Sequence, residues 1–109
     1  MPIFALNGKY TPEALAAVRK AGFASREPQM KSMAEQFGGT VVAVYWPATP
    51  DWDFVCLADL PSADDAYAVA SFSNASGSFL RVQATQLRTS AEADAAIARQ
   101  LNWTPPGQS

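Results

Sequence analysis

The fold is decided by residues 40–58, TVVAVYWPATPDWDFVCLA. β-Branched and aromatic residues fill positions 40–46 and 54–58, and such residues are typical of strands. Between these two runs lies the segment Pro47-Ala48-Thr49-Pro50-Asp51, whose prolines and aspartate favour a turn. We therefore predict a β-hairpin over residues 40–58, with a rigid connection framed by its two prolines.

One strand and one interrupted helix are predicted before this hairpin. An apolar run within residues 3–10 indicates the strand, and Thr11-Pro12-Glu13 is a typical helix start, with threonine as N-cap and proline in the first turn. We expect that helix to be bent around residues 22–28, where a glycine and a proline interrupt its apolar pattern, and Ser25 to cap the second piece. Gly38-Gly39 ends it.

A helix, a strand and a final helix are predicted after the hairpin. The helix begins at its N-cap Ser62 and ends at Ser76-Gly77. Residues 79–87 form the strand, and a capping box from Thr89 to Glu92 starts the last helix. The buried face of the middle helix is predicted to hold Ala63, Ala66, Tyr67 and Ala70.

The predicted order is β-α-β-β-α-β followed by a C-terminal helix. Two right-handed crossovers joined by a hairpin form an antiparallel four-stranded sheet with helices on one face. This is the α+β, ferredoxin-like sandwich. We predict a single domain over residues 1–103 and a flexible tail over residues 104–109.

Composition limits the functions open to the chain of 109 residues. Its hydrophobic fraction of 49% is typical of a globular domain, and its net charge of −2 argues against nucleic-acid partners, which require a basic face. The single cysteine cannot form an internal disulfide. Because neither a signal peptide nor an apolar run of roughly 20 residues is apparent, we expect a cytoplasmic protein without membrane contact.

Both faces of the hairpin are apolar. In its second strand Phe54 and Cys56 point to one face, whereas Val55 and Leu57 point to the other. A sheet with one solvated face would carry polar residues there. We therefore predict that the open face is covered by a second copy of the chain, because exposed apolar patches mark interfaces and homodimers are the commonest closed assemblies.

The same alternation groups the residues of the other two strands. In the first hairpin strand, we expect Val42, Val44 and Trp46 to oppose Val41, Ala43 and Tyr45. In residues 79–87, we expect one face to hold Phe79, Arg81, Gln83, Thr85 and Leu87. Arg81, Gln83 and Thr85 would then line a partly polar space beside the dimer interface.

The chain resembles the GYD-domain proteins over nearly its whole length except the tail. The matching pieces, in the family's order, are Gly8-Lys9-Tyr10-Thr11-Pro12-Glu13, Gly38-Gly39, Tyr45-Trp46, Asp51-Trp52-Asp53-Phe54-Val55 and Ser76-Gly77. The resemblance places Pro50, Trp52 and Asp53 where the family carries its Gly, Tyr and Asp. It implies a ferredoxin-like domain related in shape to dimeric α/β-barrel proteins and supports the dimer, and it supplies no assigned catalytic residue.

The sequence lacks the residues of the commonest catalytic and metal sites. It contains no histidine and only Cys56, so no metal or cofactor is expected. Asp51 and Asp53 would share one face of an extended segment, where one carboxyl could raise the pKa of the other and act as an acid. The favoured alternative is structural, with Asp51 completing the turn and Asp53 accepting hydrogen bonds. Cys56 is expected to be a buried, inert thiol.

Two further groups of residues are candidates for binding a ligand. Tyr45, Trp46 and Trp52 either line an apolar pocket or anchor the core and an interface. Lys9, Tyr10 and Arg26 occupy loops that can face one cleft and bind an anion. The alternative, favoured for surface charges in general, is a solvated surface or a salt bridge between Arg26 and Asp53. The predicted ligand-binding set is Lys9, Tyr10, Arg26, Tyr45, Trp52 and Asp53.

Three functions remain open from the sequence. The favoured one is a non-enzymatic oligomeric module that binds a small apolar or anionic molecule or another protein. The second is a cofactor-independent enzyme of the dimeric α/β-barrel type that acts on a small aromatic or dicarbonyl compound, with Asp53, Tyr45 or Arg26 moving a proton. The third is a regulator that acts by protein contact. A closed cavity with one of these three groups pointing into it would discriminate the enzyme from the non-enzymatic module, and a sheet face wholly sealed by the dimer would exclude the enzyme.

Overall fold

The computed structural model describes residues 1–108, and its elements follow the order predicted from the sequence. The strands are β1 (Ile3–Tyr10), β2 (Thr40–Tyr45), β3 (Phe54–Asp59) and β4 (Phe79–Leu87). The helices are α1 (Pro12–Ala21), the 3₁₀ turn η1 (Phe23–Arg26), α2 (Glu27–Gln36), α3 (Ala63–Ala75) and α4 (Ser90–Ile97). The prediction of an α+β domain with a hairpin over residues 40–58 is confirmed.

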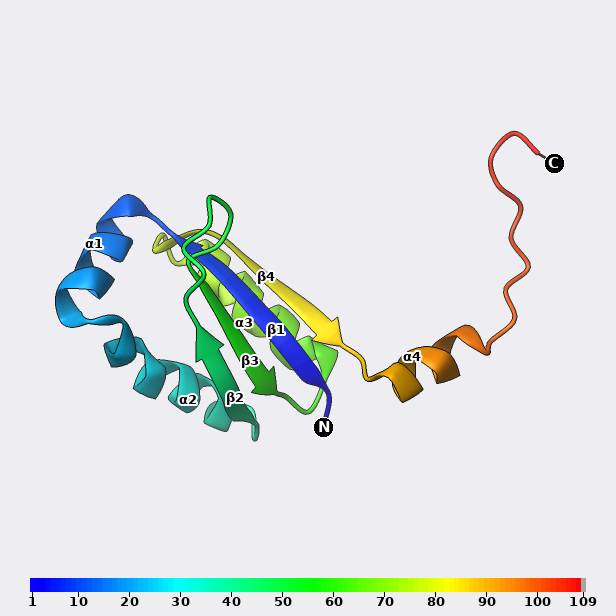
Figure 1. Ribbon diagram of the computed structural model, residues 1–109, viewed down its shortest axis with the longest axis horizontal. Coiled ribbons are helices and arrows are strands. Elements are labelled where there is room, and N and C mark those ends of the chain that lie inside the picture. The colour runs from blue at the N-terminus through cyan, green and yellow to red at the C-terminus, as the bar shows by residue number, and fades with distance from the viewer. Residues whose placement is uncertain (109) are drawn as a thin grey trace.

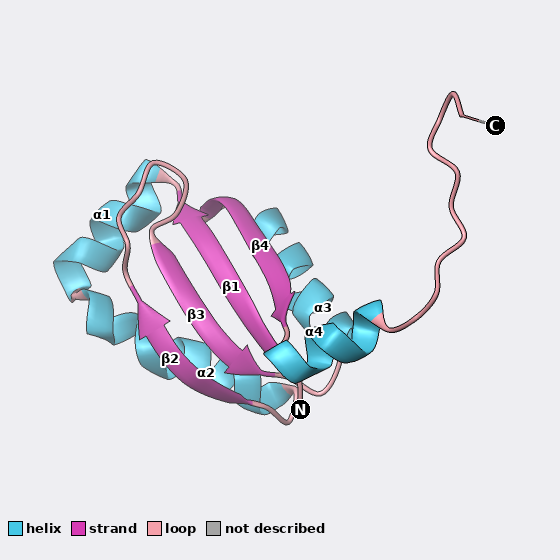
Figure 2. Cartoon of the chain, turned by 45° about the vertical axis from the view of Figure 1, so that its right-hand side comes forward, coloured by secondary structure: helices cyan, strands magenta, loops and turns pink. Residues whose placement is uncertain are grey.

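The four strands form one open antiparallel sheet in the order β2-β3-β1-β4. Helices α1, α2 and α3 lie behind the sheet in Figure 2, and the face turned toward the viewer carries none of these three helices. We call the helix-covered side the core face and the opposite side the outer face. Helix α4 and the chain after it project from the end of β4, away from the rest of the molecule (Figure 1).

The first helical segment is broken where the sequence predicts a bend. Thr11 caps α1 by accepting a hydrogen bond from the Ala14 N–H at 3.3 Å. The helix ends at Gly22, whose φ of 97° is accessible to a residue without a Cβ. Ser25 does not cap the second piece as predicted: its hydroxyl donates to the Gly22 carbonyl at 2.6 Å, inside η1. The bend places Arg26 at the junction of η1 and α2.

The core face is built from alternate residues of the two central strands. β1 contributes Phe4, Leu6 and Tyr10, and β3 contributes Phe54, Cys56 and Ala58; all six are buried. At Gly8 a Cβ would lie 2.3 Å from the Phe54 ring, so glycine at this position lets that ring cover the strand. Helix residues close the core, chief among them Val18, Met30, Ala34 and Ala66.

The predicted buried face of α3 is wrong in two of its residues. Ala66 is buried and Val69 packs against the core, but Ala63 is exposed and Tyr67 is 75% exposed. Asn74 attaches the helix to the edge strand, because its side chain both donates to the Val82 carbonyl at 3.0 Å and accepts from the Val82 N–H at 2.7 Å. These two bonds attach the C-terminal end of α3 to β4, and Ala66 on the same helix is buried in the core.

Two irregularities change which residues share a face. In β2 the register shifts between Val41 and Ala43, so Val41 joins Val44 on the core face and Val42 is 57% exposed. The predicted alternation was therefore wrong at these positions. A second shift at the end of β1 brings Phe79 opposite Tyr10 and into the core, whereas Arg81 lies opposite Lys9 on the outer face. Bulges of this kind are not visible in an alternating pattern.

The outer face has an apolar centre with polar groups beside it. Ile3, Ala5, Val55 and Leu57 lie there half-buried, and Tyr45 is 62% exposed. The Asn7 side chain lies between Val55 and Gln83 in register, and its Oδ1 atom is buried with no hydrogen-bond partner among the residues that the structure describes. Gln83 donates to Thr85 at 3.1 Å.

The C-terminal helix begins as predicted, but the large apolar residues in it and after it are exposed. Thr89 and Glu92 form the expected capping box. Ile97, Leu101 and Trp103 are each exposed by more than two-thirds of their surface. Residues 101–108 form neither helix nor strand, and the predicted flexibility of the tail stays a prediction. Over residues 1–108, no helix combines the length and apolar character that crossing a membrane requires.

Candidate functional site

A cavity of about 180 Å³ lies between the core face of the sheet and helices α2 and α3. It forms because α2 packs on β2 and β3, whereas α3 packs on β4 and β1. The floor is apolar and comes from both central strands and β4: Leu6, Phe54, Cys56, Phe79 and Val82. The helices add Met30, Met33 and Val69 as walls. Polar atoms come from Tyr10, Arg26, Gln29 and Ser73.

Tyr10 and Arg26 form the polar centre of this cavity. The Tyr10 side chain is only 4% exposed, and its ring stacks on Phe79 with centroids 4.9 Å apart. Burial raises the pKa of the Tyr10 phenol above its ordinary value, the Arg26 guanidinium opposes that rise through a hydrogen bond and its charge, and the charge of Asp53 adds to it. The phenol therefore keeps its proton near neutral pH and acts as a hydrogen-bond donor or acceptor.

Arg26 has no carboxylate partner in the part of the chain that the structure describes. The two salt bridges found over residues 1–108 join Lys9 to Asp53 and Arg81 to Asp51. The predicted alternative of a salt bridge between Arg26 and Asp53 is thus wrong. A half-buried guanidinium without an anionic partner retains donors for a ligand, because only part of its five N–H groups can serve one phenol oxygen.

Asp53 holds the end of β1 in place. Its backbone N–H donates to the Gly8 carbonyl at 2.8 Å, and its Oδ2 atom accepts from the Tyr10 N–H at 2.9 Å. Its Oδ1 atom accepts from the Lys9 Nζ atom at 3.0 Å. The carboxylate therefore binds the backbone of the residue whose phenol enters the cavity. The sequence-based preference for a structural Asp53 is confirmed, and its effect on the cavity is to position Tyr10.

Asp51 and Asp53 do not form an acid–base pair. Asp51 is exposed and lies 3.4 Å from the Arg81 Nη2 atom, whereas Asp53 is buried and bonded to Lys9 and Tyr10. The two carboxylates thus have different partners and very different access to water. Neither residue lines the cavity.

The connection between β2 and β3 folds over the outer face at the end of β1. Thr49 and Trp52 close it through three mutual hydrogen bonds of 2.9–3.2 Å. Lys9 donates to the Thr49 carbonyl at 3.2 Å, and the Arg81 guanidinium lies over the Trp52 ring at 5.6 Å. Figure 1 shows this loop crossing β1. Lys9 and Trp52 are therefore part of a structural corner on the side opposite the cavity.

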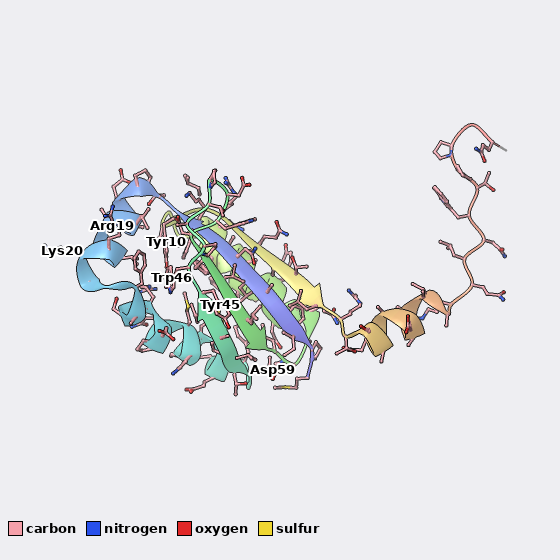
Figure 3. All side chains as sticks on the ribbon, in the orientation of Figure 1. Tyr10, Arg19, Lys20, Tyr45, Trp46 and Asp59 are labelled. Carbon is pink, nitrogen blue, oxygen red and sulfur yellow. The ribbon has the colours of Figure 1, made fainter. Side chains whose placement is uncertain are left out.

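The structure divides the predicted binding set into three places. Tyr10 and Arg26 meet in the cavity, whereas Lys9, which was predicted to face the same cleft, does not line it. Lys9, Trp52 and Asp53 build the corner, and Tyr45 lies on the outer face. Figure 3 labels Tyr10 and Trp46 at the end of the sheet beside α1, and Asp59 at the opposite end.

Several cavity residues were not singled out as ligand contacts from the sequence. Met30 and Met33 were interpreted as core, and they are core residues that also leave space beside them. Ser73 follows Ala66 and Val69 at helical spacing, and this signal could have located the correct face of α3. Gln29 and Phe79 carry no such signal, since Gln29 is exposed and Phe79 enters the core through a bulge.

Cys56 lies at the floor of the cavity and is 1% exposed. Burial raises the pKa of its thiol from 9.0 to about 11. The thiol is therefore protonated at neutral pH, and the thiolate is the nucleophilic form. The expectation of a buried, unreactive cysteine agrees with this environment.

Over residues 1–108, no three His, Cys, Asp or Glu side chains gather in a way that would hold a metal ion.

A second depression adjoins the cavity at the end of the molecule near α1. It is lined by Ala14, Val18, Ser76 and Ser78, and it shares Tyr10, Arg26 and Phe79 with the cavity. The polar pair is thus reached from two sides.

The sheet, its one-sided helices and the cavity between them define a small α+β domain with a cavity between its layers. The family model described as GYD domain matches residues 4–97. The chain therefore belongs to the GYD domain family, as the sequence resemblance indicated. Neither a curated protein nor a solved structure matches the chain in the corresponding searches.

Proposed function

We propose that this GYD domain is a non-enzymatic module that binds a small organic anion in the cavity between the sheet and helices α2 and α3. One observation carries the proposal: the Arg26 guanidinium, which has no carboxylate partner within residues 1–108, and the buried Tyr10 phenol meet at a mainly apolar cavity of about 180 Å³. Pockets with apolar walls and a few convergent polar groups are the usual form of small-molecule sites. Arg26 supplies charge, and Tyr10 supplies orientation.

Binding is favoured over catalysis by the protonation states in the cavity. A general base must be able to take a proton near the working pH. The phenol of Tyr10 and the thiol of Cys56 both have raised pKa values, so both hold their protons. The alternative enzyme would have to use Tyr10 as a proton donor, with Arg26 stabilising the negative charge that develops. Asp53 and Tyr45, the other sequence candidates, lie outside the cavity lining.

The fold and the assembly belong to the same proposal. The strand order β2-β3-β1-β4 with all neighbours antiparallel supports the ferredoxin-like sandwich inferred from the sequence. We propose that two copies meet through their outer faces, which would cover Val55 and Leu57 and leave the cavities on the outside of the dimer.

The binding proposal is tested by thermal unfolding in the presence of a library of small metabolites. A compound that binds only the native state raises the melting temperature. We expect at least one organic anion to raise it, and Ser73→Leu, which fills the cavity wall, to abolish the rise. Ser71→Leu, on the exposed side of the same helix, is the matched control and should retain it. Absence of any hit, or equal hits in both variants, would contradict the proposal; turnover of a hit compound would favour the enzyme.

The dimer is tested separately by sedimentation equilibrium. We expect a mass of twice the chain's 11.6 kDa, reduced to a single chain by Leu57→Asp at the centre of the outer face. Tyr67→Asp, an exposed position on α3, should leave the mass unchanged. A concentration-independent monomer in the unmodified protein would overturn this part of the proposal.

A further inference from the structure

We propose that the ligand of the cavity is a monocarboxylate with a single aromatic ring, such as benzoate, bound with its ring on the apolar floor and its carboxylate at Arg26 and Tyr10. This inference rests on the proposed binding function and names the chemical class of ligand. Size, the position of the polar groups, the character of the walls and the net charge each restrict that class.

The volume of the cavity restricts the ligand to one ring. An engineered apolar protein cavity of roughly 150 Å³ binds benzene. The cavity here measures about 180 Å³, which leaves room for one ring and a short polar substituent. Any larger group would have to extend out of this space, past Arg26, into the depression that shares Tyr10 and Phe79 with the cavity.

The one charged group of the lining, Arg26, lies at the start of α2, whereas the floor is apolar, so the ligand must be amphiphilic. The floor residues Leu6, Phe54 and Cys56 are at most 6% exposed. Arg26 is half-buried, and Gln29 beside it on α2 is exposed, so this end of the cavity opens to water. An apolar body therefore enters first, and its charged end remains at the mouth. Full burial of a charge on the floor would be costly, because no cation reaches that depth.

The walls favour an aromatic body over an aliphatic one. Tyr10, Phe54 and Phe79 form a cluster with centroid separations of 4.9–6.0 Å, and their relative tilts range from stacked to edge-on. Met30 and Met33 face this cluster across the cavity from α2. Offset or edge-on ring contacts and thioether–ring contacts each add stabilisation beyond burial of apolar area.

A single positive charge favours a monoanion. Arg26 is the one cation in the cavity lining. Lys9 belongs to the other face of the sheet and is paired with Asp53. A carboxylate matches the fork of one guanidinium, with the Tyr10 hydroxyl as an additional donor. A phosphate dianion would keep one charge uncompensated in a partly buried site.

The experiment follows the methyl resonances of ¹³C-methyl-methionine-labelled protein during titration with benzoate, benzyl alcohol, hexanoate and acetate. Met30 and Met33 report on the cavity, and Met1, 66% exposed at the chain start, is the internal control. We expect benzoate to shift Met30 and Met33 but not Met1, and to bind more tightly than the other three probes.

Variants separate the charge from the cavity. Arg26→Met should weaken benzoate binding about ten- to hundred-fold, the range for a charge-assisted hydrogen bond, and leave benzyl alcohol unchanged. Arg26→Lys, which keeps the charge but not the fork, should recover part of the loss, and Arg99→Met, at an exposed position after α4, should have no effect. Tyr10→Phe should weaken benzoate about five- to ten-fold.

The outcomes distinguish this inference from the proposal on which it depends. Equal binding of benzoate and benzyl alcohol, unaffected by Arg26→Met, would overturn the anionic class while the cavity remained a binding site. Tighter binding of hexanoate than benzoate would overturn the aromatic class. If no probe shifts Met30 or Met33, both the ligand class and the binding function are wrong.

Discussion

The two faces of the sheet are made from neighbouring residues of the same strands, yet they differ in what covers them. The core face is covered by helices and retains a cavity that is lined in part by the Tyr10–Arg26 pair. The outer face keeps half-buried apolar residues, a corner held by Lys9 and Asp53, and an unpartnered Asn7 oxygen. Two adjacent residues in a strand can therefore have opposite roles, one in packing or binding and the other in assembly.

The largest difference in stability is expected between substitutions at Gly8 and Asn7, which are consecutive in β1 and face opposite sides of the sheet. Gly8→Ala puts a Cβ 2.3 Å from the Phe54 ring and should lower the free energy of unfolding by about 3 kcal/mol, at the upper end for overpacking. Asn7→Ala removes no core contact, and it should change the free energy of unfolding by less than about 0.5 kcal/mol. Urea titration of both variants in dilute solution measures the difference; equal effects would contradict it.

The next contrast is between Asp53 and Asp51, which lie two residues apart in the corner. Asp53→Ala leaves the buried Tyr10 N–H without its acceptor and the Lys9 ammonium with the Thr49 carbonyl but no anion, and we expect a loss of about 2–3 kcal/mol in the free energy of unfolding. Asp51→Ala breaks one exposed ion pair and should cost at most about 0.5 kcal/mol. Thermal unfolding at pH 7 compares the two, and similar melting temperatures would remove the assigned role of Asp53.

Cys56 should make the core face sensitive to alkaline pH. Its thiol pKa is raised from 9.0 to about 11, so the unfolded chain loses this proton before the folded one. The stabilisation is complete below pH 9 and is lost as pH rises toward and through the folded value, about 2 kcal/mol between pH 9 and 11.

Cys56→Ala should remove this part of the pH dependence. Urea titrations of both proteins at pH 8, 9, 10 and 11 give the difference, in which the contribution from Tyr10 cancels. Parallel pH profiles would show that the thiol has the same pKa in the folded and unfolded states.

The smallest effect is expected at Tyr45, the outward neighbour of Trp46. Tyr45→Ala should change the free energy of unfolding of the dilute protein by about 0.5 kcal/mol or less, because its side chain is 62% exposed. Trp46→Ala should cost about 2 kcal/mol, since the indole packs against Phe23 and Phe54 with centroids 4.8 and 5.9 Å apart. Differential scanning calorimetry of both variants tests this ordering, and a reversed order would place Tyr45 in the core.

The elements were predictable because their signals are local. The N-cap at Thr11, the capping box at Thr89 and the β-branched hairpin strands each act within a few residues, and all are found as predicted. The errors come from contacts between distant segments. Asn74 attaches α3 to β4, and the register shift near Val42 arises in the pairing of β2 with β3.

The candidate site was predicted in part. The sequence brought Tyr10 and Arg26 together as polar residues in loops that can meet, and the bend at η1 does bring them to one cavity. The predicted set also included Lys9, Trp52 and Asp53. In the structure these three residues belong to the corner, where Lys9 bonds to Asp53 and to the Thr49 carbonyl. Charge and aromaticity identify residues that can bind a ligand, but they do not tell on which side of a sheet each side chain lies.

The sequence by itself determined the order of strands and helices along the chain, the hairpin and membership of the GYD family. Backbone propensities, caps and turns are set by neighbouring residues, so they can be read along the chain. Only the tertiary structure decided that α2 and α3 pack on different strands, and thereby leave a cavity beside Arg26. The reason is that a cavity is the space left by the packing of distant elements, and no local pattern encodes that space.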